Sequence, residues 1–264
     1  YDISDRENPK LVKDYNLHGY YLESRMISNN IYFIVQEGVY YYSRFVDTPV
    51  IMESSKIIAR PEIYYFDNPE ANYNFNTIAS FNILEDADKV NAKTFMMGWS
   101  NTIYVSQDNI YIAYQKNLPY TYYNNHNEKR FYDIIVPLLP SDIQSGISEV
   151  KSDSNLNSYE KWDKVSVILE EMYNRMDEDG KEELVEKIEK AVAEYEEKIQ
   201  AERMKSVIHR IAIDDGSIEY GARGEVPGYL LNQFSLDEHN KNLRVATTTE
   251  IWTQKSVMYN NVFV

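Results

Sequence analysis

The feature that most constrains the fold of this chain is a pattern of short strands and turns that occurs three times. Each copy opens with alternating apolar residues, passes through an acidic turn and continues into two or three more short strands. The copies span Tyr1–Gln36, Thr77–Gln115 and Ser206–Thr248. Repeats of about 40 residues built from short strands are typical of propeller blades. The pattern predicts an all-β fold, a β-propeller segment of about three four-stranded antiparallel blades over residues 1–264.

Short turns identify the strands that correspond between the repeats. Asn29-Asn30 precedes an alternating strand over Ile31–Gln36, and Gln107-Asp108 precedes a similar strand over Asn109–Gln115. Two-residue polar turns between apolar runs are typical of hairpins. We therefore expect these two strands, together with Leu243–Thr248, to occupy equivalent positions in their blades.

Two insertions interrupt the repeats. Residues 37–76 contain three prolines and short strand-like runs, and are interpreted as an irregular or hairpin insertion before Thr77–Leu84 resumes as an outer strand. Residues 140–205 carry apolar side chains at helical spacing over Ser158–Met176 and again over Lys181–Lys205. They predict an antiparallel helical hairpin inserted between the third and fourth strands of one blade.

Composition excludes several classes of partner. The net charge of −15 argues against a nucleic-acid backbone and against anionic lipid. Cysteine is absent, so there is no disulfide, thiolate metal site or cysteine nucleophile. Tyrosine, with 24 copies, favours half-exposed sheet faces over a recognition surface. No apolar run reaches membrane-spanning length. Because Tyr1–Ser4 and Asn260–Val264 both have the pattern of blade strands, the chain is interpreted as a piece of a longer protein.

Candidate catalytic residues do not cluster in the sequence. The four histidines, His18, His126, His209 and His239, are far apart and form neither an HxH nor an HExxH spacing. No GxSxG, P-loop or GxGxxG motif is present. We expect the histidines not to converge, and a strand or turn role for His209 and His239 is favoured over metal binding.

Acidic pairs at strand ends allow two interpretations. They are Asp2/Asp5, Asp86/Asp88, Asp214/Asp215 and Asp237/Glu238. Carboxylates at such turns bind calcium in some proteins, but short acidic side chains also stabilise the turn itself, and this second reading is favoured. The Asp177–Gly180 turn is not an EF-hand, since Gly180 at loop position six would put Arg175 at position one. Whether any metal binds is left open.

Several segments resemble a known family. The run Gly224–His239 (GEVPGYLLNQFSLDEH) and Leu243–Thr248 (LRVATT) are similar to secreted archaeal and bacterial proteins with a C-terminal β-propeller domain, which is distantly WD40-like. Tyr1–Asp5 and Asn109–Ala113 resemble the same family. The likeness implies a secreted or cell-surface setting, a propeller of which this chain is about three blades, and no established catalytic residues.

These observations favour a non-enzymatic extracellular or cell-surface β-propeller that acts as a binding or assembly scaffold. Its partner is a protein or a glycan, or a second copy bound through an open end strand or the helical hairpin. No cofactor is expected. The alternative is a hydrolase or lyase that uses acidic residues near the propeller axis, with calcium as a candidate ion.

Overall fold

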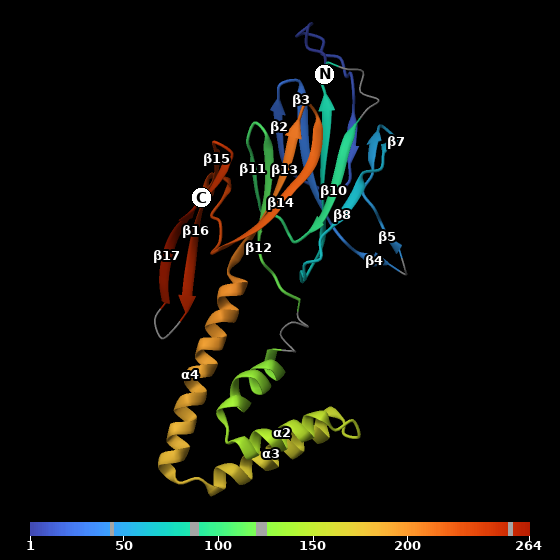
Figure 1. Ribbon diagram of the computed structural model, residues 1–264. Helices are drawn as coiled ribbons and strands as arrows, with labels where there is room; N and C mark the ends of the chain where they lie inside the picture. The colour runs from blue at the N-terminus through green and yellow to red at the C-terminus, as the bar shows by residue number, and fades with distance from the viewer. Residues whose placement is uncertain (43–44, 85–89, 120–125, 253–255) are drawn as a thin grey trace. The chain divides into compact units, whose positions relative to one another are not determined.

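The structure is a computed structural model that describes residues 1–42, 45–84, 90–119, 126–252 and 256–264. The chain divides into two compact units (Figure 1). The first combines Tyr1–Pro119 with Ala201–Val264 and holds the described strands. The second, Tyr120–Gln200, is helical in its described part.

The first sheet has five strands, in the spatial order β2 (Tyr20–Ile27), β3 (Asn30–Gly38), β9 (Asn74–Asn82), β10 (Asn91–Met97) and β8 (Glu62–Tyr65). Neighbours are antiparallel except at one edge, where β8 runs parallel to β10. The central strand β9 is buried on both faces, with Ile78 in one apolar cluster and Ala79 in another.

The second sheet has four antiparallel strands, in the order β11 (Thr102–Val105), β12 (Asn109–Gln115), β13 (Lys205–Asp214) and β14 (Ser217–Pro227). The third sheet has three, in the order β15 (Leu236–His239), β16 (Asn242–Trp252) and β17 (Ser256–Phe263). Among the described residues, only the second sheet has the predicted four antiparallel strands.

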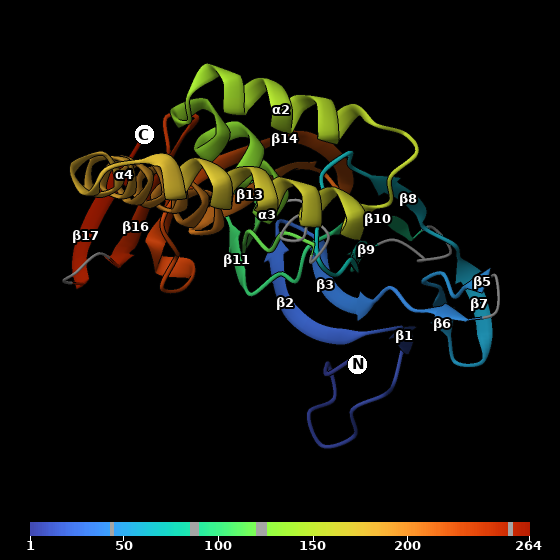
Figure 2. The ribbon, with the colours of Figure 1, turned by 90° about the horizontal axis from the view of Figure 1, so that it is seen from below.

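Two small sheets contain strands of the first insertion. The hairpin β6 (Ile51–Glu53) and β7 (Lys56–Ala59) pairs with β1 (Tyr15–Leu17), as Figure 2 shows. A second hairpin consists of β4 (Tyr41–Tyr42) and β5 (Phe45–Val46). Stacking of Tyr15 on Phe81 of β9, with ring centroids 4.3 Å apart, attaches this part to the first sheet.

The strands predicted to correspond do correspond. Ile31–Gln36 lies in β3, Asn109–Gln115 is β12, and Leu243–Thr248 lies in β16. Each of these strands is second in its sheet, forms a hairpin with the strand before it and pairs antiparallel with the strand after it. This prediction is confirmed.

Both β3 and β12 begin with Asn-Ile-Tyr, and both use this motif to bind the next sheet. Asn30 donates from Nδ2 to Asp215 Oδ1 at 3.1 Å. The Tyr32 hydroxyl accepts a hydrogen bond from the Gly216 backbone N–H at 2.9 Å. Asp215 and Gly216 form the turn between β13 and β14. The first sheet is thereby joined to the second by polar contacts at one end.

The second copy of the motif binds the third sheet in a related way. Asn109 donates from Nδ2 to both carboxylate oxygens of Glu238, at 2.9 and 3.0 Å. Ser106 donates to Glu238 Oε2 at 2.5 Å, and the Glu238 backbone N–H donates to the Tyr104 hydroxyl at 3.0 Å. Hydrogen bonds to an ionised acceptor are stronger than neutral ones, so one carboxylate holds the two sheets together.

Apolar packing fills the space between consecutive sheets. The core between the first and second sheets includes Ile34 and Phe95 on one side and Ile112 and Ile211 on the other, all 0% exposed. A smaller cluster joins the second and third sheets and contains Tyr111, Ala113, Ile208, Leu236 and Val245. Each fully buried aliphatic side chain contributes roughly 1.5–3 kcal/mol.

The boundaries of the repeats were wrong in two places. Thr77–Leu84, expected as an outer strand, lies mainly in β9, the centre of the first sheet. The sequence pattern over Lys89–Phe95 also predicts a strand, the first of the second blade, but the corresponding strand is β10, which pairs with β9 in the first sheet. One repeat of the sequence therefore completes one sheet and begins the next.

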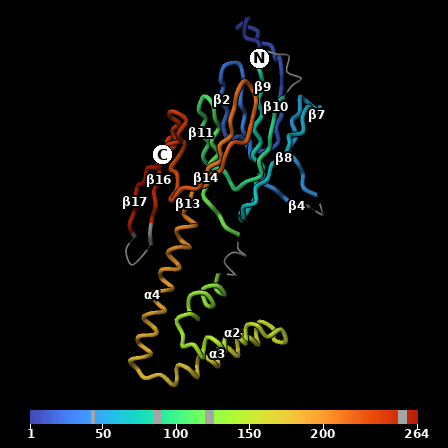
Figure 3. Tube along the Cα trace, viewed as in Figure 1, coloured from blue at the N-terminus to red at the C-terminus, as the bar shows by residue number. Residues whose placement is uncertain are grey.

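The two insertions leave their sheets at equivalent positions in the strand order. Residues 39–73 connect β3 to β9, and residues 116–204 connect β12 to β13, so each lies between the second and third strands of a sheet (Figure 3). The helical insertion was expected between a third and a fourth strand, and that prediction was wrong because β10 belongs to the first sheet.

The sequence pattern predicts strands over Tyr1–Ser4 and over Gly228–Leu236, and the described residues form neither of them in full. Tyr1–Ser4 forms only an isolated bridge, Asp2 to Lys10, so it is not a blade strand. Gly228–Leu236 contains a bridge from Tyr229 to Thr248 and the turn η3 (Gln233–Ser235), which Asn232 caps by accepting a hydrogen bond from the Phe234 N–H. The cap ends the extended run before β15 begins.

The helical unit has more helix than the sequence predicted. Its elements are η1 (Arg130–Ile135), η2 (Val136–Leu138), α2 (Ser141–Ser152), α3 (Ser158–Arg175) and α4 (Glu178–Arg203). The bounds of α3 and α4 agree with the two predicted helices. Capping explains the start of α3, because Asn157 Oδ1 accepts from the Tyr159 and Glu160 N–H groups at 2.9 and 3.1 Å.

The partner of α3 differs from the predicted antiparallel α4. Helix α3 packs along α2, with Val165 and Ile147 buried in one apolar cluster. Helix α4 joins that cluster only near its start, through Leu184 and Ile188. The sequence pattern for α2 was overlooked, and α2 supplies the apolar surface that α4 was expected to provide. No helix in the described ranges has the length and apolar content needed to cross a bilayer.

Candidate functional site

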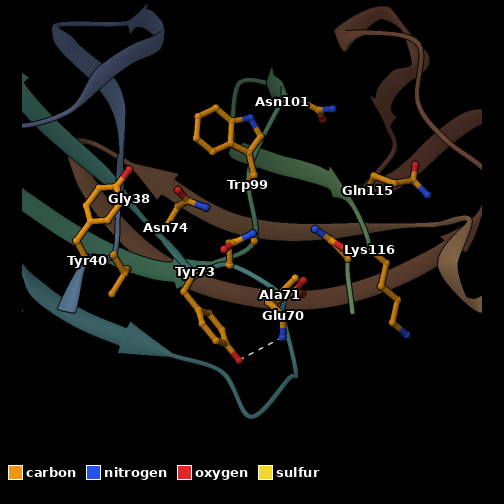
Figure 4. Close-up of a pocket in the computed structure, with 14 residues that line it drawn as sticks. Gly38, Tyr40, Glu70, Ala71, Tyr73, Asn74, Trp99, Asn101, Gln115 and Lys116 are labelled. Carbon is orange, nitrogen blue, oxygen red and sulfur yellow. Dashed lines mark hydrogen bonds between the residues drawn. The ribbon is translucent and has the colours of Figure 1, made fainter. Parts of the chain in front are cut away.

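A cavity of about 790 Å³ lies where the two insertions leave the first and second sheets (Figure 4). It is formed by the end of β3, the return of the first insertion into β9, the connection from β10 to β11, and the end of β12. We call it the insertion pocket, and its lining residues are 38–40, 70–74, 98, 99, 101 and 115–117. Each lining segment is anchored by a strand, so a ligand here would contact a rigid frame.

Glu70 is the buried acid of the insertion pocket. Its side chain is 5% exposed, and its Oε1 accepts a hydrogen bond from the Tyr114 hydroxyl at 3.0 Å. Its Oε2 has no hydrogen-bond partner among the described residues. Burial raises the pKa of the Glu70 carboxyl, although the hydrogen bonds from Tyr114 and the Asn117 backbone oppose that effect. A buried, unpartnered carboxyl oxygen is unusual and favours a polar ligand.

The loop that carries Glu70 is held in place from two sides. The Tyr73 hydroxyl donates to the Asn68 carbonyl at 2.6 Å and accepts from the Glu70 backbone N–H at 3.3 Å. The Ala71 N–H donates to the Asn117 carbonyl at 2.8 Å, which ties the loop to the end of β12. The first insertion thus supplies the floor of the pocket and fixes it to the second sheet.

A chain of buried polar groups continues beneath Glu70. The Tyr114 hydroxyl lies 3.3 Å from His209 Nε2, and His209 Nδ1 lies 3.2 Å from the Tyr220 hydroxyl. Burial, assisted by the charge of Arg223, lowers the pKa of His209 to about 3, so the ring is neutral near pH 7. With its proton on Nε2, the ring donates to Tyr114 and accepts from Tyr220, which leaves the Tyr114 proton for Glu70.

A glycine makes this arrangement possible. A Cβ on Gly98 would lie 2.4 Å from the Tyr114 ring, closer than two carbon atoms approach without repulsion. Gly98 therefore lets Tyr114 pass directly against the backbone and reach Glu70. Trp99, which follows it, lines the pocket and is largely exposed.

Two exposed aromatic rings stand at the walls of the pocket. Trp99 is 61% exposed and Tyr40 is 67% exposed, although large aromatic side chains are usually well buried. Figure 4 shows Tyr40 on the side opposite Lys116, with Trp99 between them. Exposed rings around a cavity provide flat apolar surface for a ligand.

Amide side chains dominate the polar lining. Asn72, Asn74, Asn101, Gln115 and Asn117 all line the pocket. Asn74 is 3% exposed, and its Nδ2 has no hydrogen-bond partner among the described residues. An amide both donates and accepts hydrogen bonds, so this lining suits a ligand whose groups do the same.

The lysine of the pocket is already paired. Lys116 Nζ donates to Glu225 at 3.1 Å and to Glu202 at 3.2 Å. Burial opposes the charged form of Lys116, but these two hydrogen bonds outweigh it and raise its pKa. Its charge is therefore largely compensated before any ligand arrives.

The four histidines lie in separate environments. His209 is buried under the insertion pocket, and His18 and His239 are exposed. His126 belongs to the helical unit, where its Nδ1 lies 3.0 Å from the Tyr195 hydroxyl. Within the part of the chain that the structure describes, no three His, Asp or Glu residues form a group able to hold a metal ion.

The acidic residues that the structure describes either stabilise turns or form hydrogen bonds between sheets. Asp2 accepts from the Ser4 N–H at 2.9 Å and Asp5 from the Glu7 N–H at 3.1 Å, which are turn contacts. Asp177 accepts from the Gly180 N–H at 2.9 Å and so caps α4. Asp215 and Glu238 bind the asparagines of the repeated motif. Asp86 and Asp88 lie outside the described residues.

Sequence reasoning missed Glu70, Trp99 and Tyr114. Glu70 follows Pro69 in an insertion without a regular pattern, and Tyr114 has the alternation of an ordinary strand residue. One signal was available in the sequence. The Gly98-Trp99 pair lies between two strand-like runs and puts a large aromatic residue next to a glycine. That pattern is typical of a turn and gives no hint of the distant carboxyl.

Comparison with known proteins gives a family and two uncharacterised relatives. A family model described as a β-propeller domain matches residues 1–264. An uncharacterised protein of Methanocaldococcus jannaschii is 26% identical over 275 aligned positions, which cover 100% of this chain and 41% of that protein. An uncharacterised protein of Archaeoglobus fulgidus is 25% identical over 258 positions, with 95% and 39% covered. The chain thus spans about two-fifths of the length of these relatives.

Proposed function

Because the chain belongs to the β-propeller domain family, we propose that it is a binding domain without catalytic activity, and that its ligand occupies the insertion pocket. The observation that carries the proposal is the pair of buried, unpartnered atoms in the lining, Glu70 Oε2 and Asn74 Nδ2. Leaving a buried polar atom without a hydrogen bond costs about 1–3 kcal/mol. A ligand that satisfies both atoms recovers that free energy.

The size and walls of the pocket support the same proposal. Its volume of about 790 Å³ falls in the range of about 300–1,000 Å³ that is usual for small-molecule sites. Trp99 and Tyr40 supply apolar contact area, and the amides supply orientation. The lining is a mixture of aromatic and polar groups on a strand scaffold, which is the composition of a binding site.

The hydrolase or lyase alternative has less support. Hydrolysis of glycosides uses two carboxyl groups about 5–10 Å apart. The described lining of the insertion pocket supplies one, Glu70. As part of the proposal, the domain works outside the cell or at its surface, which rests on the resemblance of Gly224–His239 to secreted propeller proteins.

Trp99 offers a direct test. In a variant with Trp162→Phe and Trp252→Phe, Trp99 is the one tryptophan left of three. A panel of sugars, amino acids, nucleosides, carboxylic acids and quaternary amines is titrated against its fluorescence. We expect at least one class to give a saturable change that Glu70→Gln weakens. Phe234→Ala, at a residue 87% exposed in the turn η3 before β15, is the control. The absence of any saturable change in the folded protein would contradict the proposal.

A further inference from the structure

The chemistry of the insertion pocket narrows the class of its ligand, on the premise that the pocket binds one. The lining combines three kinds of group: exposed aromatic rings, side-chain amides and one buried carboxyl. Few ligands match all three. The matching ligand needs apolar faces for the rings and, around its edges, many groups that both donate and accept hydrogen bonds.

The rings select a ligand with flat apolar faces. Trp99 lines the cavity and exposes 61% of its surface. The Tyr40 ring lies directly against the backbone of Gly38, where a Cβ would be 2.7 Å from it. Tyr40 is therefore packed on one side, and it loses less freedom when a ligand stacks on it.

The amides select hydroxyl groups. A hydroxyl donates one hydrogen bond and accepts others, and an amide side chain has the complementary capacity. Asn74 Nδ2 offers a donor, and Glu70 Oε2 offers an acceptor, each without a partner among the described residues. A ligand hydroxyl that reached either atom would give it the missing hydrogen bond, whereas an apolar ligand would leave both unpaired.

The charges exclude an ionic ligand. Lys116 is the cation of the lining, and Glu202 and Glu225 already neutralise it. An anionic ligand would therefore meet no free positive charge in the lining, and the chain as a whole carries a charge of −15. A cationic ligand would meet one acid in the lining, Glu70, and burial disfavours the charged form of that carboxyl and so raises its pKa.

We propose that the insertion pocket binds a neutral oligosaccharide, with one sugar ring stacked on Trp99 and its hydroxyls hydrogen-bonded to Glu70 and Asn74. Rings of neutral sugars combine apolar C–H faces with a rim of hydroxyls. The volume of about 790 Å³ leaves room for more than one ring. Tyr40 lines the same cavity and is 67% exposed, which makes it a candidate contact for a second sugar unit.

The test uses calorimetry on the full chain with defined trisaccharides. Cellotriose, maltotriose, mannotriose and N-acetylchitotriose are the neutral probes, while trigalacturonic acid and chitosan trimer are the anionic and cationic ones. We expect saturable binding of at least one neutral trisaccharide and at least tenfold weaker binding of both charged trimers. Trp99→Ala should weaken the neutral sugar at least tenfold, and Phe234→Ala should leave it within twofold.

A second pair of variants separates direct contact from damage to the fold. Glu70→Gln keeps the shape of the side chain, and Asn101→Ala changes an exposed amide at the rim. We expect Glu70→Gln to weaken binding of the neutral trisaccharide at least fivefold and Asn101→Ala to weaken it at least twofold. The melting temperatures of both variants should stay within a few degrees of the parent. Binding of a charged trimer alone, or of another class in the fluorescence panel alone, would overturn the sugar assignment but leave the binding function. If none of the probes binds, both the sugar assignment and the binding function are wrong.

Discussion

The two insertions leave their sheets at equivalent positions, yet they relate to the rest of the chain in opposite ways. Residues 39–73 are built into the first unit: β8 extends the first sheet, β6 of the β6–β7 hairpin pairs with β1, and Glu70 is hydrogen-bonded to Tyr114 of the second sheet. Residues 120–200 fold as a compact unit with their own apolar cluster around Val165 and Leu184. The position of an insertion therefore does not decide its role, but its apolar and polar contacts do.

The difference also explains where the candidate site lies. An insertion that returns against its own sheets brings buried polar groups to a strand end, as Glu70 does beside Tyr114. An insertion with its own core satisfies its groups internally, as the Asn157 cap does at the start of α3. We infer that the first insertion created the pocket.

Deleting each insertion gives the largest expected contrast. Replacing residues 120–200 by a short Gly-Ser linker should leave the sheet signal in circular dichroism intact and the melting temperature within a few degrees. Replacing residues 47–65 should abolish cooperative unfolding, because it removes Ile51, which is 0% exposed, and the edge strand β8. Similar melting curves for the two deletions would show that the insertions are equally independent.

Two glycine-to-alanine substitutions compare how closely the two regions are packed. Gly98→Ala puts a Cβ 2.4 Å from the Tyr114 ring and should lower the free energy of unfolding by about 1–3 kcal/mol. Gly146→Ala in α2 meets Ile168 at an ordinary 3.6 Å and should raise it by about 0.5–1 kcal/mol, since alanine favours a helix. Urea unfolding measures both. Equal effects of the same sign would contradict the difference in packing.

Lowering the pH should reduce the stability of the first unit more than that of the helical unit. The pKa of His209 is lowered to about 3 from 6.5, so the unfolded chain binds a proton below pH 6.5 that the folded chain refuses. This residue alone should cost about 2 kcal/mol of stability between pH 7 and pH 5. In His209→Gln that slope should disappear. Near-ultraviolet dichroism reports on the sheets, and the 222 nm signal of the helical unit is the control. An unchanged slope in the variant would refute a neutral, buried His209.

Local patterns predicted the elements of the fold better than their partners. The strands at β3, β12 and β16 and the helices α3 and α4 follow from alternation and helical spacing, which are properties of neighbouring residues. The membership of β10 in the first sheet depends on pairing with β9, and the partner of α3 depends on α2. Such contacts between distant residues leave no mark on local periodicity.

The candidate site could not be predicted for the same reason. Glu70 and Tyr114 are 44 residues apart, and Tyr114 and His209 are 95 apart. Each has an ordinary local context, and only the antiparallel pairing of β12 with β13 brings Tyr114 near His209. The repeated Asn-Ile-Tyr at Asn30 and Asn109 was visible in the sequence, but its role in joining sheets required the positions of Asp215 and Glu238.

The junction after the second strand of each sheet has a practical use. It holds residues 39–73 in the first sheet and 116–204 in the second. In the third sheet the β16–β17 ladder extends to the pair Trp252 and Ser256, which have three residues between them in the sequence. Antiparallel pairing holds both ends of such a junction, so a longer connection costs only a slowly growing loop entropy. For protein engineering, this third junction is a grafting point, where a reporter or an affinity peptide could be displayed without disturbing the pocket.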